Sequence, residues 1–214
     1  MTELTDRHRA YSIALRDKKM FPVLAIGSAG TGKTFGAVEL AVEWLGSKRH
    51  VVITRPNVTF ADEMGFLPGS EREKMLPWIR PVLQCFRALG YGNSHIEGWE
   101  NKGQLTFLPL GTIQGMTFDN TLVIVDEVEN MTFQQLKVML ARMGKWSKIV
   151  LCGDIAQVSP HFKGSGLAEL IRMVNALNLP VHIIEFTHDD IVRSSQCRDW
   201  IVAFDRWEAN HADR

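Results

Sequence analysis

A glycine-rich segment constrains this chain more than any other feature of its sequence. It follows the apolar run at residues 23–26 and precedes a stretch with helical spacing of apolar residues. Glycines let the backbone turn tightly so that amide hydrogens face an anion, and the start of the next helix adds partial positive charge. This order of strand, turn and helix predicts a phosphate-binding P-loop. Its residues are Gly27, Ser28, Ala29, Gly30, Thr31, Gly32, Lys33 and Thr34.

Two carboxylates follow a second apolar strand and complete the predicted chemistry. Residues 122–125 are Leu-Val-Ile-Val, and Asp126 and Glu127 come directly after them. In a P-loop enzyme, Lys33 neutralises the β- and γ-phosphates, and Thr34 and Asp126 hold Mg²⁺. Glu127 is then the candidate base for the attacking water. The sequence therefore predicts a site for Mg²⁺ and a nucleoside triphosphate, with ATP the expected nucleotide.

A third strand end adds a candidate sensor of the γ-phosphate. Gly153 and Asp154 follow the apolar residues 149–152, and Gln157 comes three positions later. The carboxyl ends of strands in open α/β sheets border the ligand crevice. Gln157 is therefore expected to donate its amide hydrogen to the γ-phosphate or to the attacking water.

Apolar strands alternate with helical patterns along the chain, which predicts an α/β fold with a mainly parallel sheet and helices on both faces. A helix over 71–89 contains Pro77 and Pro81, which are expected to break or kink it. A final helix is expected over 189–208. The expected strands are 23–26, 51–54, 105–108, 121–125, 148–151 and 181–186; the other helices are 4–17, 33–45, 132–143 and 165–176.

The length and composition of the chain limit the number of domains and the kinds of partner and location that we expect. The 214 residues are 45% hydrophobic, which suits a single domain over 1–214. Lysine plus arginine and aspartate plus glutamate number 24 each, so a nucleic-acid surface would have to be local. No leader or membrane span is expected, because no apolar run reaches about 18 residues. The scattered Cys85, Cys152 and Cys197 fit a reduced, cytoplasmic setting.

The order of these motifs resembles the PhoH-like proteins, a family of RecA-like P-loop NTPases allied to superfamily 1 helicases. The resemblance covers nearly the whole chain. Besides the P-loop and Asp126-Glu127, it rests on residues 54–56 (Thr-Arg-Pro), 65–69 (Gly-Phe-Leu-Pro-Gly), Asn130, Arg142 with Gly144, Gly153-Asp154 with Gln157, 165–167 and 190–193.

This resemblance implies an ATPase that acts with RNA or single-stranded DNA, with helicase activity a further implication. It makes Thr54 and Arg55 candidates for contacting a nucleic-acid phosphate, although a strand-ending turn explains the same residues. The family's T-x-x-Q-x-x-Y adenine-reading pattern falls on Thr5, His8 and Tyr11, where His8 replaces the glutamine. Other departures are Gln114 to Thr117 in place of R-G-R-T, Glu129 in place of glutamine and Ser194 in place of histidine.

In helicases with two RecA-like domains, the second domain supplies positively charged residues to the γ-phosphate. A chain with one domain has no such source. Arg142 and Arg193 lie in family motifs and are the candidates to replace that charge, either within the chain or from a neighbouring subunit. An arginine delivered in trans, head to tail, closes a ring when the rotation allows. We therefore expect a homo-oligomer, with a hexameric ring the most plausible. In the alternative interpretation, both arginines pair with nearby carboxylates.

Two other functions remain open at this point. A small-molecule kinase would use the same P-loop, although the adjacent Asp126 and Glu127 argue against it. A nucleotide-dependent oligomeric binding or scaffold protein with little hydrolysis would also keep these motifs.

Overall fold

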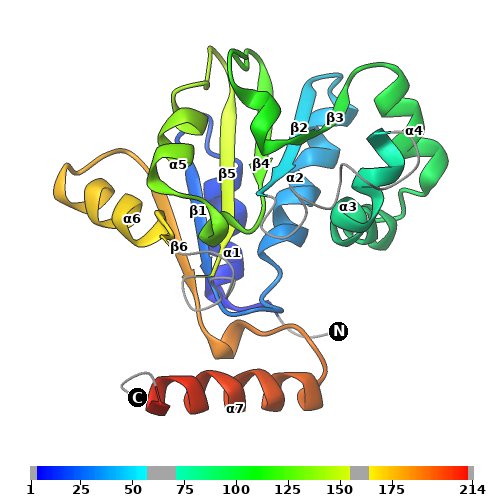
Figure 1. Ribbon diagram of the computed structural model, residues 1–214. Coiled ribbons are helices and arrows are strands. Elements are labelled where there is room, and N and C mark those ends of the chain that lie inside the picture. The colour runs from blue at the N-terminus through cyan, green and yellow to red at the C-terminus, as the bar shows by residue number, and fades with distance from the viewer. Residues whose placement is uncertain (1–3, 57–70, 155–163, 212–214) are drawn as a thin grey trace.

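Six parallel strands form one sheet, in the order β3-β2-β4-β5-β1-β6 (Figure 1). The computed structural model describes residues 4–56, 71–154 and 164–211, and the side chains among them except those of 71–75 and 208–211. The strands are β1 (Val23–Gly27), β2 (His50–Arg55), β3 (Leu105–Pro109), β4 (Thr121–Val125), β5 (Lys148–Gly153) and β6 (His182–Phe186).

The central strands are apolar on both sides because helices cover both faces of the sheet. Every residue of β4 and β5 is buried, as are the first four of β1. The helices are α1 (Asp6–Leu15), α2 (Lys33–Gly46), α3 (Glu71–Ala88), α4 (Asn93–Asn101), α5 (Phe133–Leu140), α6 (Leu167–Ala176) and α7 (Ser195–His211).

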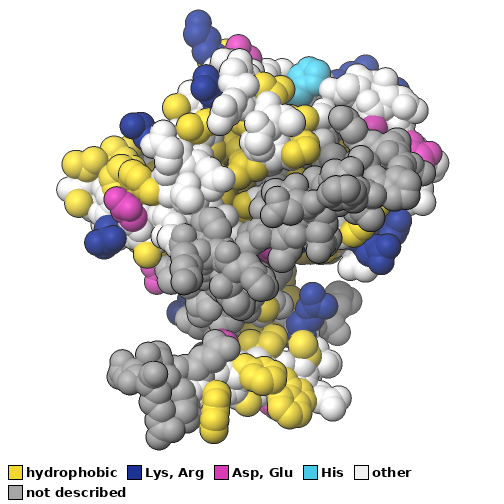
Figure 2. All heavy atoms as spheres, viewed as in Figure 1, with side chains coloured by type: hydrophobic (Ala, Val, Ile, Leu, Met, Phe, Trp, Pro, Cys, Tyr) yellow, Lys and Arg dark blue, Asp and Glu magenta, His cyan; other side chains and the backbone are white. Residues whose placement is uncertain are grey.

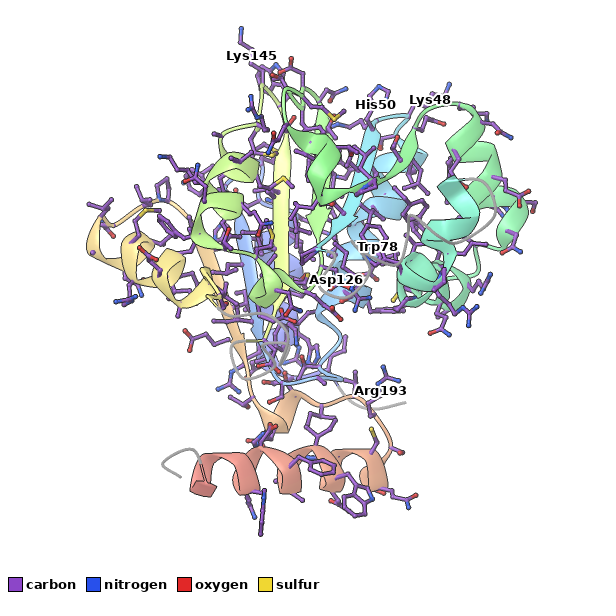
Figure 3. All side chains as sticks on the ribbon, viewed as in Figure 1. Lys48, His50, Trp78, Asp126, Lys145 and Arg193 are labelled. Carbon is purple, nitrogen blue, oxygen red and sulfur yellow. The ribbon has the colours of Figure 1, made fainter. Side chains whose placement is uncertain are left out.

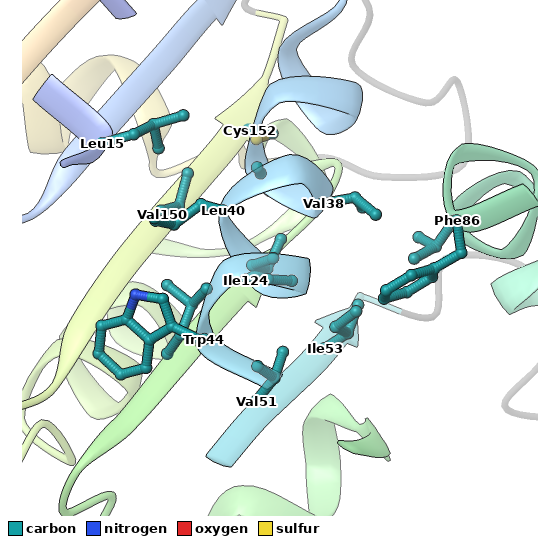
Figure 4. Close-up of a cluster of buried hydrophobic side chains, with 14 of the residues drawn as sticks. Leu15, Val38, Leu40, Trp44, Val51, Ile53, Phe86, Ile124, Val150 and Cys152 are labelled. Atoms are coloured by element: carbon teal, nitrogen blue, oxygen red, sulfur yellow. The ribbon is translucent and has the colours of Figure 1, made fainter. Parts of the chain in front are cut away.

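Two hydrophobic cores lie on opposite faces of the sheet. One is formed by α1, α2, α3 and α4, where Leu40, Trp44 and Phe86 pack against strand residues such as Ile124 and Val150 (Figure 4). The other is formed by α5 and α6. Burial at about 25 cal/mol per Å² of apolar surface stabilises this sandwich. The predicted α/β class with a parallel sheet covered on both faces is confirmed.

Three expectations about helices differ from the structure. α3 runs through Pro77 and Pro81, so the expected break does not occur, whereas the alternative of a kink stays a prediction. Both prolines lie on the exposed side of α3, whereas Ile79 and Phe86 on the opposite side are buried. α4 was not anticipated. The last helix begins at Ser195 rather than 189, because a 3₁₀ turn, η4 (His188–Asp190), precedes it.

None of the helices in the described part of the chain is both long enough and apolar enough to cross a membrane.

Candidate nucleotide site

The P-loop is a tight turn between β1 and α2 that only glycine can make at several positions. Gly27, Gly30 and Gly32 have φ angles of +130°, +77° and +81°. A Cβ atom on Gly27 would lie 2.1 Å from the carbonyl oxygen of Phe186 on β6. The loop therefore depends both on positive φ angles and on close contact with the neighbouring strand.

Lys33 is the first residue of α2, and its side chain folds over the loop. Its Nζ donates to the carbonyl oxygens of Gly27 (2.5 Å) and Ser28 (2.8 Å) and lies 3.3 Å from the Thr31 hydroxyl. Burial lowers the pKa of Lys33, and the nearby carboxylate of Asp154 opposes that shift. The ammonium group is thus held at the centre of the loop, where the sequence predicts phosphate.

Asp126 lies at the end of β4, across from the start of α2. Its Oδ1 accepts a hydrogen bond of 2.8 Å from the Thr34 hydroxyl. Burial raises the pKa of Asp126, whereas the Thr34 hydrogen bond and the positive charges of Arg55 and Lys33 favour its ionised form. A carboxylate beside a hydroxyl at the P-loop is the donor set that holds Mg²⁺ in P-loop enzymes, so these residues fit the predicted metal.

Glu127 stands apart from the buried Asp126 although it is the next residue. Its backbone adopts a left-handed conformation, with φ +55°, which turns the chain into the 3₁₀ segment η3 (Val128–Asn130). Its side chain is 39% exposed and forms an ion pair with Arg55, whose Nη2 donates to Glu127 Oε1. Such a conformation costs about 1–3 kcal/mol and is common at functional sites.

Thr54 and Arg55, the candidates for contacting a nucleic-acid phosphate, are the last two residues of β2. The carbonyl oxygen of Thr54 accepts from the Asp126 amide at 3.0 Å, which fixes β2 against the end of β4. The Thr54 hydroxyl is buried and has no hydrogen-bond partner among the described residues. The Arg55 side chain is 20% exposed. Burial lowers its pKa, and the charges of Asp126 and Glu129 oppose that shift.

Glu129 belongs to the site although sequence reasoning gave it no role. It is 4% exposed, and its Oε2 accepts from the backbone amide of Asp154 at 3.1 Å. Burial raises the pKa of Glu129 to about 7. The only sign of this position in the sequence was that a glutamate replaces the glutamine that is frequent in the family. Together with Asp126 and the buried Asp154, Glu129 makes this end of the sheet rich in carboxyl groups.

α1 supports the loop from the opposite side. His8 Nε2 lies 3.0 Å from the Thr31 carbonyl oxygen, and its Nδ1 lies 2.8 Å from the Thr5 hydroxyl. Tyr11 is buried in the core, where its hydroxyl donates to the carbonyl oxygen of Lys33 at 2.9 Å. The structure thus places His8 at the rim of the P-loop and Tyr11 beneath it.

The two candidate arginines lie at opposite ends of the sheet. Arg193 Cγ would be 2.8 Å from a Cβ atom on Gly30, so this arginine borders the P-loop of its own chain (Figure 3). Arg142 follows α5, and its carbonyl oxygen accepts from Phe118, ahead of β4. β4 therefore separates Arg142 from Asp126, by about 16 Å at ~3.3 Å per residue. Gln157 lies outside the described residues.

β5 lies between the P-loop strand β1 and the acid-bearing strand β4. The carboxyl ends of these parallel strands bring Lys33, Asp126 and Asp154 to one edge of the sheet. This fold and this edge define the class: a P-loop NTPase fold of RecA-like architecture.

The PhoH-like protein family model matches residues 1–205, and the chain belongs to that family. PhoH-like proteins of Bacillus subtilis and Synechocystis are 35% and 33% identical to it over 201 and 210 residues. These alignments cover 92% and 95% of this chain, and protein PhoH of Escherichia coli is 33% identical over 91%. The chain spans 55% to 62% of the length of these relatives.

A solved structure shares the fold at low sequence identity. The large terminase from the thermophilic bacteriophage D6E, in complex with ADP, superposes with a TM-score of 0.53 at 16% identity. The match covers 91% of this chain and 48% of the terminase chain. This similarity supports the architecture of the sheet and its helices.

Proposed function

We propose that this protein binds ATP with Mg²⁺ at the P-loop and hydrolyses it. The observation that carries the proposal is the 2.8 Å contact between Thr34 and Asp126, beside the half-buried ammonium group of Lys33. Lys33 would neutralise the β- and γ-phosphates. Thr34 and Asp126 would hold the metal ion, which supplies charge neutralisation for the phosphates when bound.

Glu127 is the proposed general base, and its ion pair with Arg55 bears directly on that role. A base must reach the attacking water, but the Arg55 guanidinium group occupies one oxygen of this carboxylate. Arg55 is also the residue expected to meet a nucleic-acid phosphate. A phosphate that attracted Arg55 would release Glu127, which would couple hydrolysis to RNA or single-stranded DNA.

We further propose a homo-oligomer, with a hexameric ring the arrangement we favour. Arg193 borders the P-loop of its own chain, whereas Arg142 lies at the far end of the sheet. Arg142 can therefore act only on the P-loop of another copy, as an arginine finger does. The free thiols of Cys85, Cys152 and Cys197 fit a cytoplasmic location.

Phosphate release tests this proposal most directly. It should be measured with ATP and with GTP, each with and without RNA or single-stranded DNA. We expect hydrolysis that requires Mg²⁺ and is stimulated by one polymer. Arg55→Ala should raise the rate without polymer and abolish the stimulation, whereas Arg80→Ala, an exposed α3 arginine, should do neither. No phosphate release from the wild type in any combination would contradict the proposal.

A nucleotide-dependent scaffold with little hydrolysis is the second candidate. It is favoured by the Arg55–Glu127 ion pair, which withholds the base. Equal, negligible phosphate release from the wild type and from Glu127→Gln, with nucleotide binding intact in both, would support the scaffold.

A further inference from the structure

Two side chains of α1 hold two carbonyl oxygens of the P-loop. His8 Nε2 lies 3.0 Å from the carbonyl oxygen of Thr31. One turn further along the helix, the Tyr11 hydroxyl donates to the carbonyl oxygen of Lys33 at 2.9 Å. Residues three positions apart lie on one face of a helix, so a single face of α1 is turned towards the loop.

A second segment, residues 190–193, holds the same loop. The backbone amide of Val192 donates to the Gly30 carbonyl oxygen at 3.0 Å. A Cβ atom on Gly30 would lie 2.8 Å from Arg193 Cγ. Arg193 is exposed, and Figure 3 labels it just above α7, where Figure 2 shows a dark blue side chain. The P-loop is thus held by two segments that are far apart in the sequence.

These contacts fix the direction of the amide hydrogens that the loop offers to phosphate. In a trans peptide, the carbonyl oxygen of one residue and the amide hydrogen of the next point in opposite directions. The contact between His8 and the Thr31 carbonyl oxygen therefore directs the Gly32 amide away from α1. Because a P-loop binds phosphates through its amides, this contact should affect every nucleotide alike, whatever its base.

Both nitrogens of the His8 ring are engaged within the chain. An imidazole offers Nδ1 and Nε2 and no other polar atom. Since a carbonyl oxygen only accepts, Nε2 carries a hydrogen and donates it to Thr31. Nδ1 lies 3.2 Å from the Thr5 backbone amide and 2.8 Å from the Thr5 hydroxyl. The ring therefore makes its polar contacts with the protein itself.

Tyr11 is enclosed beneath the loop. It is 3% exposed, and its ring packs edge-on against Phe186 with the two centroids 5.5 Å apart. A Cβ atom on Gly36 of α2 would lie 2.7 Å from Tyr11 Cε1. A nucleotide base could not reach this ring without moving α1 or α2.

Thr5 extends the His8 contact to a buried carboxylate. Its hydroxyl donates to Asp190 Oδ1 at 2.6 Å, and Asp190 is 1% exposed. The other carboxylate oxygen of Asp190 accepts from the Thr187 amide at 2.7 Å. Asp190, Thr5 and His8 thus form a chain of contacts that joins the segment at 190–193 to the P-loop through the start of α1.

We propose that His8 is a positioning residue that directs the P-loop amides and does not read the nucleotide base. A residue that distinguishes adenine from guanine must offer a free donor or acceptor to N6 of adenine or O6 of guanine. The engaged ring of His8 offers neither. The substrate class at this position is therefore a purine nucleoside triphosphate held by its phosphates, with ATP and GTP treated alike. This inference rests on the proposed nucleotide binding.

Kinetics with both nucleotides test the role of His8. His8→Leu removes the donor to Thr31, whereas His8→Gln keeps one. We expect His8→Leu to raise KM for ATP and for GTP by the same factor, about 3- to 10-fold for one lost hydrogen bond, with kcat within about twofold. His8→Gln should recover most of the loss for both nucleotides. Arg9→Ala, which alters an exposed α1 residue paired with Asp6, is the matched control and should change neither KM.

A double-mutant cycle tests the chain of contacts through Thr5. Thr5→Val removes the hydroxyl that lies between His8 and Asp190. It should raise KM for both nucleotides in the wild type but add little in the His8→Leu background, because the two changes break the same chain. Circular dichroism should show that each variant is folded.

A spectroscopic measurement separates direction of the loop from contact with the base. In protein with nitrogen-15 in its histidines, the Nε2 resonance of His8 is identified by its loss in His8→Gln. We expect this resonance to shift by the same amount with ADP and with GDP, each with Mg²⁺, because the loop and not the base transmits the change. The shifts are measured on the unaltered protein, so the result does not depend on the folding of His8→Leu.

Three results would overturn the inference. A loss in His8→Leu that is larger for ATP than for GTP by about fivefold or more would mean that His8 reads the base. Unchanged KM values for both would mean that His8 does not direct the loop. Independent effects of Thr5→Val and His8→Leu would break the proposed chain. Dissociation constants for ADP and GDP keep the proposed function separate, since a wild type that binds both nucleotides without hydrolysing ATP or GTP contradicts hydrolysis and still tests His8.

Discussion

Each end of the sheet contains a lysine that is partly or fully buried, and the two lysines are held in different ways. At the carboxyl end, Lys33 donates to backbone carbonyl oxygens of the P-loop, within reach of the charges of Asp126 and Asp154. At the amino end, Lys148 is 1% exposed and donates to the carbonyl oxygen of Asp17 at 3.2 Å. Burial lowers the pKa of both.

Burial of a charge therefore does not by itself mark the functional end of this molecule. The groups that surround each lysine distinguish the two ends. The carboxyl end combines glycines at positive φ, the left-handed Glu127 and several buried carboxyl groups. The amino end combines an apolar groove with Lys148, whose ammonium group donates to the Asp17 carbonyl oxygen. The two ends of the same strands therefore differ in chemical character.

The largest expected effect is on turnover, and it should differ between an acid at the carboxyl end of the sheet and an acid at the amino end. Glu127→Gln should lower phosphate release by about 10²–10⁴-fold with little change in nucleotide binding, because the general base is lost while the P-loop remains. Asp17→Asn, at the amino end, should leave the turnover number unchanged. Steady-state phosphate release and nucleotide titration measure both. An equal loss of turnover in Asp17→Asn would end the distinction between the two ends.

Replacing Lys33 and replacing Lys148 should have kinetic effects that differ nearly as much as those of the two acids. Lys33→Met should lower kcat/KM for ATP by about 10²–10³-fold, because it removes a charge that faces the phosphates. Lys148→Met should leave kcat/KM within about twofold. It should also keep or raise the melting temperature, since an apolar side chain often replaces a buried charge without loss. A large kinetic defect in Lys148→Met would show that the amino end takes part in the chemistry.

Backbone geometry gives a smaller effect on stability. Gly27→Ala should reduce the free energy of unfolding by about 2–4 kcal/mol, because its Cβ would clash with Phe186 and its φ is positive. Gly46→Ala, at the end of α2, has open space around it and should be neutral or stabilising by up to about 1 kcal/mol. Urea unfolding of both variants tests the pair. Similar destabilisation in both would mean that close contact at the P-loop is not the cause.

The smallest expected effect concerns pH. Burial raises the pKa of Glu129 to about 7 in the folded protein, above its usual value of 4.5. The folded state therefore binds more protons than the unfolded state between these values, so this residue should make stability fall as pH rises through that window. Glu129→Gln should remove the dependence and stabilise the protein by about 1–3 kcal/mol above pH 7. Melting temperatures from pH 4.5 to 8 measure this, and parallel curves for the two proteins would contradict it.

Much of the carboxyl end could be predicted from the sequence because its residues are close to one another along the chain. The P-loop directly joins β1 to α2, and Asp126 directly follows β4. The pairing of Arg55 with Glu127 could not be predicted, because it joins the ends of β2 and β4 across 72 positions. The burial of Glu129 likewise depends on Gly153, the last residue of β5, and on Asp154, which follows it; the sequence places both far from Glu129.

The sequence by itself determined the class of fold, because apolar strands, helical spacing and glycines at a turn are local constraints on the backbone. It also predicted residues for the phosphate site, because the P-loop directly follows β1 and Asp126 directly follows β4. Only the tertiary structure decided that Arg193 borders its own P-loop, that Arg142 lies at the other end of the sheet, and that Trp200 and Phe204 of α7 are exposed. Those outcomes depend on the order of strands in the sheet and on packing between distant segments, which no local pattern encodes.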